Sequence, residues 1–520
     1  MSIDIADATT ATVEAADPTE TSETADTDTP VRRRADRGLL VVLAFVALWC
    51  AVMYLHVWRR HDRYGTFDND LGFHDQFVWL IARGRYFSTV LGLSAFGHNA
   101  TFGYFLLAPL SRIGLGGPHW LNFINTVAVG LGAVPLYLLA RDRLGDRWRA
   151  VPFGLLWLLH PIVQGNVWET FHPDSIAMAP LLAAYLCATR RRWRPYALAL
   201  AAAVIWKSDV TLAVVALGAI VAWRGQRKVG LATIAMGVAW FAFTIGWMIP
   251  HLAGGGTVFG PLYGDLGDTP LEVAGTAVTD PGAVADRVAN NEPLRYSREL
   301  LAPYGFLPAI GGAPLLLGVP QAAVNMLSEQ AFTREWRDNA HYQALPMVAL
   351  AIALVEAVAF LDRRRGPTWA GRATGLALAC SFAATVAWGS LPPFTTQFAH
   401  YWAADGDPAR PAKDAAVNLI PKDAPVSANY LLVPHLTHRE IVYSFPNPWR
   451  SSYYGIKGTK PPDPTDVHWL AADLNVLIEG PDRELWDCII DSGAFITQFE
   501  NNGIVVAQRR KGRDDDLACR

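Results

Sequence analysis

Long runs of apolar residues dominate the chain between residues 39 and 391. The first run, residues 39–58, matches the ~20 residues that an α-helix needs to cross a bilayer. Comparable apolar segments follow at 120–140, 150–189, 195–223, 229–250, 303–331, 342–361 and 373–391. Since these runs are long and carry few charges, the pattern predicts an α-helical polytopic membrane protein.

Basic residues beside the apolar runs predict the orientation, because lysine and arginine gather on the cytoplasmic side. The arginines between residues 32 and 37 place the N-terminus in the cytoplasm, so residues 59–118 form a first external loop. A second external loop is expected at 251–302, and the whole chain is expected to make about eleven spans. The same rule predicts that Gly264 and Asn447 face outside. It places four arginines on the cytoplasmic side: Arg141, Arg191, Arg227 and Arg364.

Two of the apolar segments, 150–189 and 195–223, have basic residues at both ends, so each is expected to go out and return. Their turning points are residues 168–174 and Lys207-Ser208-Asp209. Each arm of the second hairpin is only ~14 residues, which is shorter than a full span. Its tip is therefore expected below the membrane surface, in a polar cavity enclosed by protein. The alternative is one long helix with a buried Lys–Asp pair.

The start of the chain has a different composition. Residues 1–38 predict a disordered, acidic, cytoplasmic tail, because residues 1–30 are rich in Thr, Ala, Asp and Glu and contain no Lys or Arg. The first apolar run could instead be a signal peptide. It ends at Arg59 and Arg60 without a small-residue cleavage site, so we expect a retained helix.

Prolines and charges return after about residue 392, where the long apolar runs stop. Short β-type runs alternate there with two helical patterns, at 411–420 and 482–491, which predicts a small extracytoplasmic α/β domain over 392–512 with a tail at 513–520. The predicted strands are 426–432, 441–445, 474–479, 495–499 and 504–508.

Composition agrees with this division. The chain is 52% hydrophobic and 18% charged, below the ~25% charged residues of soluble proteins. Its net charge of −3 is too small to indicate a nucleic acid partner. The five cysteines have no metal-binding spacing. Cys488 and Cys519 share the C-terminal domain and could pair in an oxidising compartment.

The first external loop contains the densest candidate chemistry, in the segment FDNDLGFHDQ at 67–76. Its three acids are Asp68, Asp70 and Asp75, and His74 lies among them. A carboxylate can take the proton of an attacking hydroxyl, and two close carboxylates, such as Asp70 and Asp75, could hold a divalent cation such as Mg²⁺ or Mn²⁺. The simpler interpretation is that these residues are polar because water wets the loop.

Further polar residues are expected on the same side, at the far end of the first loop, at the hairpin tips and before the 342–361 run. A charged group at membrane depth is costly and usually has a function, so these are candidate substrate-binding residues. They are His98, Glu169, His172, Asp174, Lys207, Asp209, Arg337, His341 and Tyr342.

The order of several short motifs resembles a bacterial multi-span family, domain of unknown function 2079 (DUF2079). The resemblance covers roughly 40–510 and includes residues 420–428 of the C-terminal domain. The motifs are Asp70-Leu71-Gly72, Phe73-His74-Asp75-Gln76, His98 before an apolar stretch ending Ala108-Pro109-Leu110, Phe171-His172-Pro173-Asp174, Lys207-Ser208-Asp209 and His341-Tyr342. By architecture, that family in turn resembles the C-type glycosyltransferase superfamily.

The resemblance implies a membrane glycosyltransferase of the cytoplasmic (plasma) membrane that uses a polyprenyl-phosphate sugar donor at its outer face. Such enzymes carry a catalytic acid in the first external loop, which would be Asp70 or Asp75, with Asp68 as the third candidate. This chain departs from the family pattern at two positions. The extra acid Asp68 precedes the usual one, and Ser208 stands where the family pattern suggests Glu. The residues that could neutralise the lipid phosphate are Lys207, Arg83, Arg85, Arg295 and Arg337.

Two other classes of function stay open. A transporter or flippase is typically built from paired halves with broken helices and midplane polar residues. Here the polar residues gather near one face and the halves do not match. A non-catalytic membrane scaffold with a sensing domain is the third interpretation.

Overall fold

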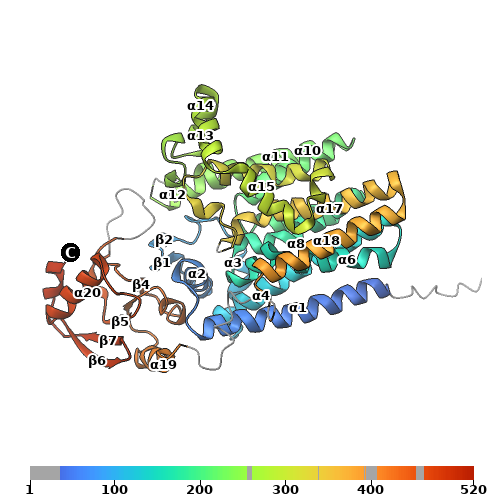
Figure 1. Cartoon of the computed structure of the whole chain (residues 1–520). Helices are drawn as coiled ribbons and strands as arrows, with labels where there is room; N and C mark the ends of the chain where they lie inside the picture. The colour runs from blue at the N-terminus through green and yellow to red at the C-terminus, as the bar shows by residue number, and fades with distance from the viewer. Residues whose placement is uncertain are drawn as a thin grey trace, which may run out of the picture. The chain divides into compact units, whose positions relative to one another are not determined.

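The structure is a computed structural model, and the residues that it describes are 36–254, 260–337, 339–391, 393, 407–451 and 462–519 (Figure 1). Most of the predicted N-terminal tail and the predicted domain boundary at residue 392 lie outside these ranges. The last residues of that tail are not disordered, because helix α1 (Arg37–Asp62) already begins at Arg37.

Five helical segments are long and apolar enough to cross a membrane. A sixth would be formed by α6 (Arg147–Leu159) and α7 (Pro161–Trp168), which meet at a bend of 47°. The five segments are α1, Pro118–Leu144, Arg227–Leu252, Ala340–Arg365 and α18 (Pro367–Trp388). The expected eleven spans are therefore not confirmed for the described residues. The difference arises because several expected spans are too short to cross alone, including α8 (Pro173–Thr189), α9 (Trp193–Val204) and α10 (Val210–Trp223).

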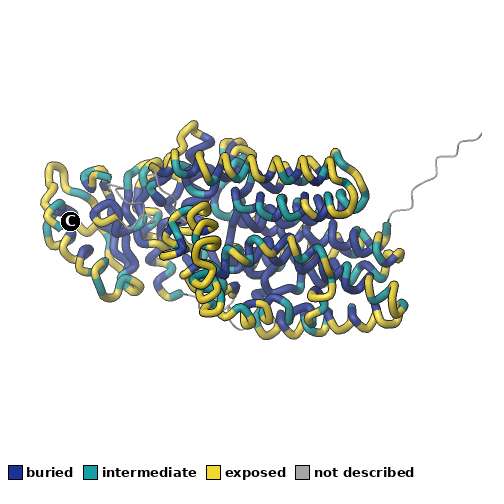
Figure 2. The backbone as a smooth tube through the Cα atoms, turned by 90° about the horizontal axis from the view of Figure 1, so that it is seen from above, coloured by how far each residue is buried: buried dark blue, intermediate teal, exposed yellow. Residues whose placement is uncertain are grey.

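Burial separates a central helix from peripheral ones. In α17 (Ala344–Arg365), 83% of the most apolar window of its span is buried inside the protein. The corresponding share is 33% for α1 and α18 and 22% for the segment Arg227–Leu252, which contains α11 (Arg227–Phe243) and α12 (Ile249–Leu252). Exposed residues accordingly follow the outer sides of the helices (Figure 2). Apolar side chains exposed in this way are suited to contact with lipid.

The second predicted hairpin is confirmed. A break at residues 205–209 separates α9 from α10. Lys207 at this break pairs with Asp174 in the first turn of α8, and Arg224 just after α10 donates to the Tyr185 hydroxyl near the end of α8 at 2.7 Å. Since α10 therefore runs in the same direction as α8, α9 must run back between them, and a single long helix is excluded.

The predicted second external loop contains more helix than expected. Between its ends lie α13 (Pro270–Thr279), α14 (Pro281–Asn290) and α15 (Pro293–Leu301). Each begins with proline, which fits the first helical turn, and the side chains of Thr269 and Asp280 cap the first two. The following residues, an apolar run in the sequence, form short 3-10 turns (Ala302–Tyr304, Leu307–Ile310 and Ala313–Leu317) and α16 (Val319–Leu327).

The first external loop is compact. It begins with the π-helical turn Asp68–Gly72, which continues into α2 (Phe73–Ile81). A two-residue antiparallel pair, β1 (Phe87–Ser88) and β2 (Leu93–Ser94), follows, and α3 (Tyr104–Arg112) closes the loop. The loop leads into α4 (Pro118–Leu131) and α5 (Ala133–Leu144).

The C-terminal domain is a mixed five-stranded sheet in the order β4-β3-β5-β7-β6. The strands are β3 (Val426–Ala428), β4 (Val442–Ser444), β5 (Trp469–Asp473), β6 (Phe495–Asn501) and β7 (Ile504–Arg509). Strands β4, β3 and β5 are parallel, and β7 is antiparallel to both β5 and β6. The α/β prediction is confirmed, but the strand predicted at 474–479 is wrong. The strand in this part of the chain is β5, a fully buried stretch that ends just before residue 474. Residues 474–479 turn away from the sheet.

The helices α19 (Arg410–Leu419) and α20 (Pro481–Asp491) match the two predicted helical patterns. Cys488 and Cys519 form a disulfide. It joins α20 to the 3-10 turn Asp515–Cys519, so most of the predicted C-terminal tail is part of the domain.

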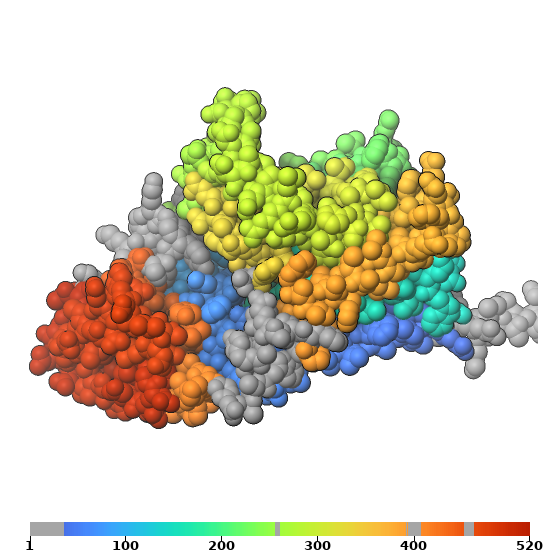
Figure 3. All heavy atoms as spheres, viewed as in Figure 1, coloured from blue at the N-terminus to red at the C-terminus, as the bar shows by residue number. Residues whose placement is uncertain are grey.

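The first loop and the C-terminal domain share an interface. The Thr89 hydroxyl donates to the carbonyl oxygen of Val442 at 2.7 Å and accepts from its N–H at 2.9 Å. Arg85 pairs with Glu440 on the same side at 2.5 Å. In the space-filling view, the blue atoms of the first loop lie beside the orange and red atoms of the C-terminal domain (Figure 3). The domain is thus positioned by the loop that carries the candidate acids.

Candidate active site

The structure separates the three acids of the first loop. Asp68 is buried and accepts a hydrogen bond from the Ser444 hydroxyl of the C-terminal domain. Asp75 is buried as well, and its Oδ2 atom lies 2.5 Å from the Thr437 hydroxyl and 3.1 Å from His438 Nε2. Both acids therefore hold the loop to the C-terminal domain.

Asp70 has a different environment. Its side chain is 31% exposed, and its Oδ1 atom lies 3.4 Å from His172 Nε2. It is the one acid of the three that is both accessible and joined to the membrane helices. Asp70 can therefore meet a substrate while His172 orients it.

Asp70 and three side chains behind it form a continuous polar chain. The His172 ring stacks on the His341 ring, with centroids 4.1 Å apart and planes 10° apart. His341 Nδ1 lies 2.8 Å from Glu169 Oε2, and the buried Glu169 also accepts the backbone N–H groups of Ala340 and His341. The turn between α7 and α8 supplies Glu169 and His172, and the start of the α17 span supplies His341, so tertiary packing creates the cluster.

Burial and pairing set the charges of this cluster. Burial opposes ionisation of Asp70, but the hydrogen bond and charge of His172 outweigh it and lower the pKa of Asp70 below its ordinary value. Burial likewise opposes protonation of His172, yet Asp70 raises the pKa of that imidazole. Burial raises the pKa of Glu169 to about 7. Asp70 is consequently an ionised carboxylate at neutral pH, able to accept a proton.

The same cluster has the ligand types of a metal site. One potential ligand atom from each of Glu169, His172 and His341 lies within 4.8 Å of the other two. Two imidazoles and one carboxylate fit Mn²⁺, Fe²⁺ or Zn²⁺ better than Mg²⁺, which prefers oxygen ligands. The expected pairing of Asp70 with Asp75 on one cation finds no support, because Asp75 is occupied by the C-terminal domain.

Lys207 forms a second polar centre at the tip of the α9–α10 hairpin. Its ammonium lies 2.9 Å from Asp174 and 3.2 Å from Asp209, and 5.9 Å from the centre of the Tyr342 ring. Tyr342 adjoins His341, and the rings of these two residues are 4.2 Å apart. An ammonium has three N–H donors, so one donor of Lys207 remains for a ligand after the two acids are satisfied.

Lys207, Asp209 and Tyr342 line a cavity of about 430 Å³ whose other walls are mostly apolar. Those walls come from α10, α11, α13 and α16, for example Phe241 and Val324. The cavity therefore combines mostly apolar walls with one ammonium and the carboxylates of Asp209 and Asp268. The walls suit the apolar chain of an amphiphile, and the remaining N–H of Lys207 can donate to its head group.

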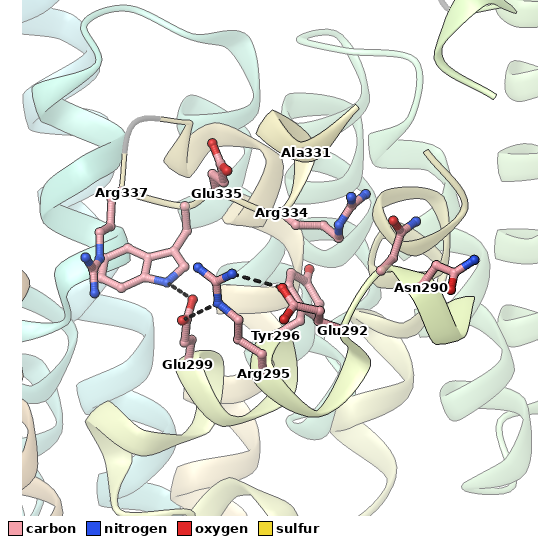
Figure 4. Close-up of a pocket in the computed structure, with 11 residues that line it drawn as sticks. Asn290, Glu292, Arg295, Tyr296, Glu299, Ala331, Arg334, Glu335 and Arg337 are labelled. Carbon is pink, nitrogen blue, oxygen red and sulfur yellow. Dashed lines mark hydrogen bonds and ion pairs between the residues drawn. The ribbon is translucent and has the colours of Figure 1, made fainter. Parts of the chain in front are cut away.

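The arginines proposed from the sequence lie elsewhere. Arg83 stacks on Trp79 and Arg85 pairs with Glu440, so both are on the side of the C-terminal domain. Arg295 and Arg337 line a separate polar cavity of about 400 Å³ (Figure 4). Its lining residues include the same number of glutamates as arginines: Arg295, Arg334, Arg337, Glu292, Glu299 and Glu335. Because this lining is mostly polar, the cavity lacks the apolar walls that a lipid chain needs, and the cavity beside Lys207 is the better candidate for a lipid phosphate.

The two remaining histidines have aromatic and hydroxyl neighbours. His74 is buried with Nδ1 2.5 Å from the Tyr104 hydroxyl, and burial lowers its pKa well below the usual range. The His98 ring packs edge-on against Phe73 at 5.2 Å, and burial lowers its pKa to about 3. Both are therefore neutral, and their contacts stabilise the first loop.

Two residues of the site had no signal in the sequence. Arg60 was counted only as a flank of the first span, but it is buried and its guanidinium lies 4.5 Å from the centre of the Trp168 ring, beside Glu169. Tyr263 lines the apolar cavity from a segment predicted as a loop. Neither has a spacing that marks it, because each reaches the site through tertiary packing.

Taken together, the fold and the site define a mostly helical, polytopic membrane protein with a C-terminal sheet and an acid-bearing loop next to a buried polar cluster. The chain belongs to DUF2079, a family of predicted membrane proteins, whose sequence pattern matches residues 60–506. No curated protein sequence matches the chain.

Two solved structures align with the chain, and the first of them supports the fold. ArnT from Cupriavidus metallidurans bound to undecaprenyl phosphate aligns with a TM-score of 0.53 and 12% identity, over 92% of this chain and 99% of ArnT. The Archaeoglobus fulgidus oligosaccharyltransferase in the apo form aligns with a TM-score of 0.38 and 14% identity, over 84% of this chain and 70% of its own.

The separation of the acids predicts different effects of neutral substitutions on stability. Asp75→Asn should destabilise the folded protein by about 1–3 kcal/mol. Its amide oxygen accepts weaker hydrogen bonds from Thr437 and His438 than a carboxylate does, and its NH2 group takes the buried place of Oδ1, which has no partner among the described residues. Asp70→Asn, at a partly exposed position, should melt close to the wild type. Thermal unfolding of the detergent-solubilised protein measures this, with the exposed Asp286→Asn as control. Equal melting temperatures for Asp75→Asn and Asp286→Asn would contradict the assignment.

Proposed function

We propose that this protein is a membrane glycosyltransferase that takes a sugar from a polyprenyl-phosphate carrier and transfers it to a hydroxyl acceptor. The observation that carries the proposal is the apolar cavity with Lys207 and Tyr342 in its wall. Tyr342 directly follows His341, which belongs to the Asp70 cluster, so the cavity adjoins that cluster. The likeness in fold to an ArnT structure bound to undecaprenyl phosphate supports a polyprenyl-phosphate partner.

In this reaction each part of the site has a role. The isoprenoid chain would occupy the apolar cavity, with the free N–H of Lys207 donating to the phosphate. Asp70 would accept the proton of the acceptor hydroxyl as its oxygen attacks the anomeric carbon. The bond between that carbon and the phosphate oxygen breaks, and the lipid phosphate leaves with the electron pair. His172 would hold Asp70 in position.

The Glu169, His172 and His341 cluster fits a divalent transition metal. When bound there, such an ion would supply positive charge beside the departing phosphate, which otherwise faces the carboxylates that hold Lys207. His341 would then be oriented by the backbone-anchored Glu169.

A second candidate function is transport of the lipid carrier, because the same cavity could hold a lipid without chemistry. The accessible and ionised Asp70 favours the enzyme, since a protein that only holds and moves a lipid needs no proton acceptor beside the lipid head group.

We also propose that Asp70 and the C-terminal domain face outward across the cytoplasmic membrane. The basic clusters support this orientation. The Cys488–Cys519 disulfide supports it independently, because disulfides persist in oxidising compartments and are rare in the cytosol.

The proposed proton acceptor can be tested by Asp70→Asn, which keeps the shape of the side chain but removes its basicity. We expect transfer to slow by about 10²–10⁴ with the membrane level of the protein unchanged. The readout is mass spectrometry of polyprenyl-phosphate sugars in deletion cells complemented with wild type, Asp70→Asn or Asp286→Asn. Only the Asp70 variant should leave the donor lipid accumulated. If it restores the wild-type profile, Asp70 is not the base.

Metal content provides a separate test. Purified protein should contain about one divalent transition metal per chain, and His341→Ala should lose it, because two ligands hold such an ion much less well than three. Elemental analysis by mass spectrometry measures the content, with the exposed His251→Ala as the matched histidine control. Equal metal in both variants would exclude the cluster as the binding site.

Cysteine labelling tests the orientation. In a background with Cys50, Cys187 and Cys380 replaced, Arg364→Cys should react with a membrane-impermeant maleimide only after the membrane is opened. Asp286→Cys, which is exposed beyond the opposite end of the helices, should react in intact cells. The reverse pattern would invert the topology and place Asp70 in the cytoplasm.

A further inference from the structure

The C-terminal domain contains a cavity of about 540 Å³ that the proposed reaction does not use. It lies where the parallel strands of the sheet end. Asn429 follows β3 directly, Phe445 follows β4, and Leu477 belongs to the turn after β5, and all three line the cavity. The carboxyl edge of parallel strands is where open α/β sheets commonly bind ligands, because the chain leaves the sheet there and exposes side chains from several strands.

Asn429 is the strongest sign that the cavity has an occupant. The residue is 3% exposed, and neither its amide oxygen nor its amide nitrogen has a hydrogen-bond partner among the residues that the structure describes. Leaving a buried polar group unsatisfied costs about 1–3 kcal/mol, so native proteins seldom do so without a reason.

The position of Asn429 is fixed by its backbone. Its N–H donates to the carbonyl oxygen of Ala471 in β5 at 3.1 Å, and its carbonyl oxygen accepts from Leu432 and Val433 at 2.9 and 3.2 Å. The side chain therefore lies in the cavity wall because the sheet places it there. A ligand that both donates and accepts would satisfy both of its amide atoms.

The other lining groups narrow the ligand class. Tyr430, a residue that is 40% exposed, contributes an aromatic ring, and Glu479 offers a carboxylate. Arg450 and Asp482 pair with each other, so they add polar edges with little net charge. An amide, a carboxylate, a neutralised ion pair and an exposed ring together suit a neutral molecule with neighbouring hydroxyl groups and apolar C–H faces, which is a sugar.

The cavity is close to Asp70. The Tyr430 ring lies 5.7 Å from the ring of Phe67 in the first loop. Ser444, the neighbour of Phe445, donates to Asp68. Phe67 and Asp70 are three residues apart, so their Cα atoms are separated by at most about 11 Å. A sugar in the cavity could thus belong to a short glycan whose next unit reaches Asp70.

We propose that this cavity at the carboxyl edge of the C-terminal sheet binds a sugar residue of the glycan acceptor through Asn429 and Tyr430. The role of this sugar as part of the acceptor rests on the proposed function, whereas the existence of the sugar site does not.

Binding can be measured on the full-length protein in lipid nanodiscs by saturation-transfer NMR. The probes are a panel of neutral mono- and disaccharides and, separately, a short Ser/Thr peptide. At least one saccharide should bind the wild type, and Asn429→Ala and Tyr430→Ala should each weaken it about tenfold or more. The exposed Asn418→Ala on α19 is the matched control and should bind normally. If no saccharide binds, if only the peptide binds, or if Asn429→Ala binds like the control, the proposal is wrong.

A folding measurement separates binding from stability. Because the Asn429 amide has no internal partner among the described residues, Asn429→Ala should melt at the wild-type temperature or above it. A clear decrease would reveal a structural partner and overturn the assignment. Saccharide binding should also persist in Asp70→Asn. Failure of the sugar site and failure of the transferase therefore give different results.

Discussion

Every acid of the site is buried or half-buried, and in a medium that excludes water such groups must be paired. The chain meets this constraint with partners that are distant in sequence. Asp68 and Asp75 bind Ser444, Thr437 and His438, Asp70 binds His172, Glu169 binds the 340–341 backbone, and Asp174 binds Lys207. Each pair joins two separate parts of the fold. The positions of the first loop, the hairpin tip and the C-terminal domain thus depend on the need to satisfy carboxylates.

This constraint also explains how one loop can have two functions. Two of its three acids are used to hold the C-terminal domain, which leaves Asp70 as the accessible one. The same loop therefore places Asp70 beside the His172 and His341 cluster, which adjoins the membrane cavity, and Phe67 beside Tyr430 in the wall of the sheet cavity. If the first holds the lipid carrier and the second holds the acceptor, Asp70 lies between the donor and the acceptor, where a proton acceptor is needed.

The sequence predicted those features that depend on local pattern. Paired basic flanks and short arms located the hairpin with its tip at Lys207. The alternation of short β-type runs with helical patterns located β6, β7 and both helices of the C-terminal domain. It could not separate Asp68, Asp70 and Asp75, because they occupy one short segment and differ only in what packs against them. The Glu169–His172–His341 cluster was named residue by residue but not as a unit, since its members come from two separate turns. The strand expected at 474–479 was misplaced because the true strand, Trp469–Asp473, is buried on both faces and lacks alternation.

The central claim is that the apolar cavity beside Lys207 holds the lipid carrier next to Asp70. The most direct measurement is an electron cryo-microscopy structure of the protein in nanodiscs with a polyprenyl phosphate. The account predicts isoprenoid density between α10, α11, α13 and α16, with the phosphate within hydrogen-bonding distance of Lys207 Nζ. Density for the lipid on another face of the protein, with this cavity filled by side chains, would contradict it.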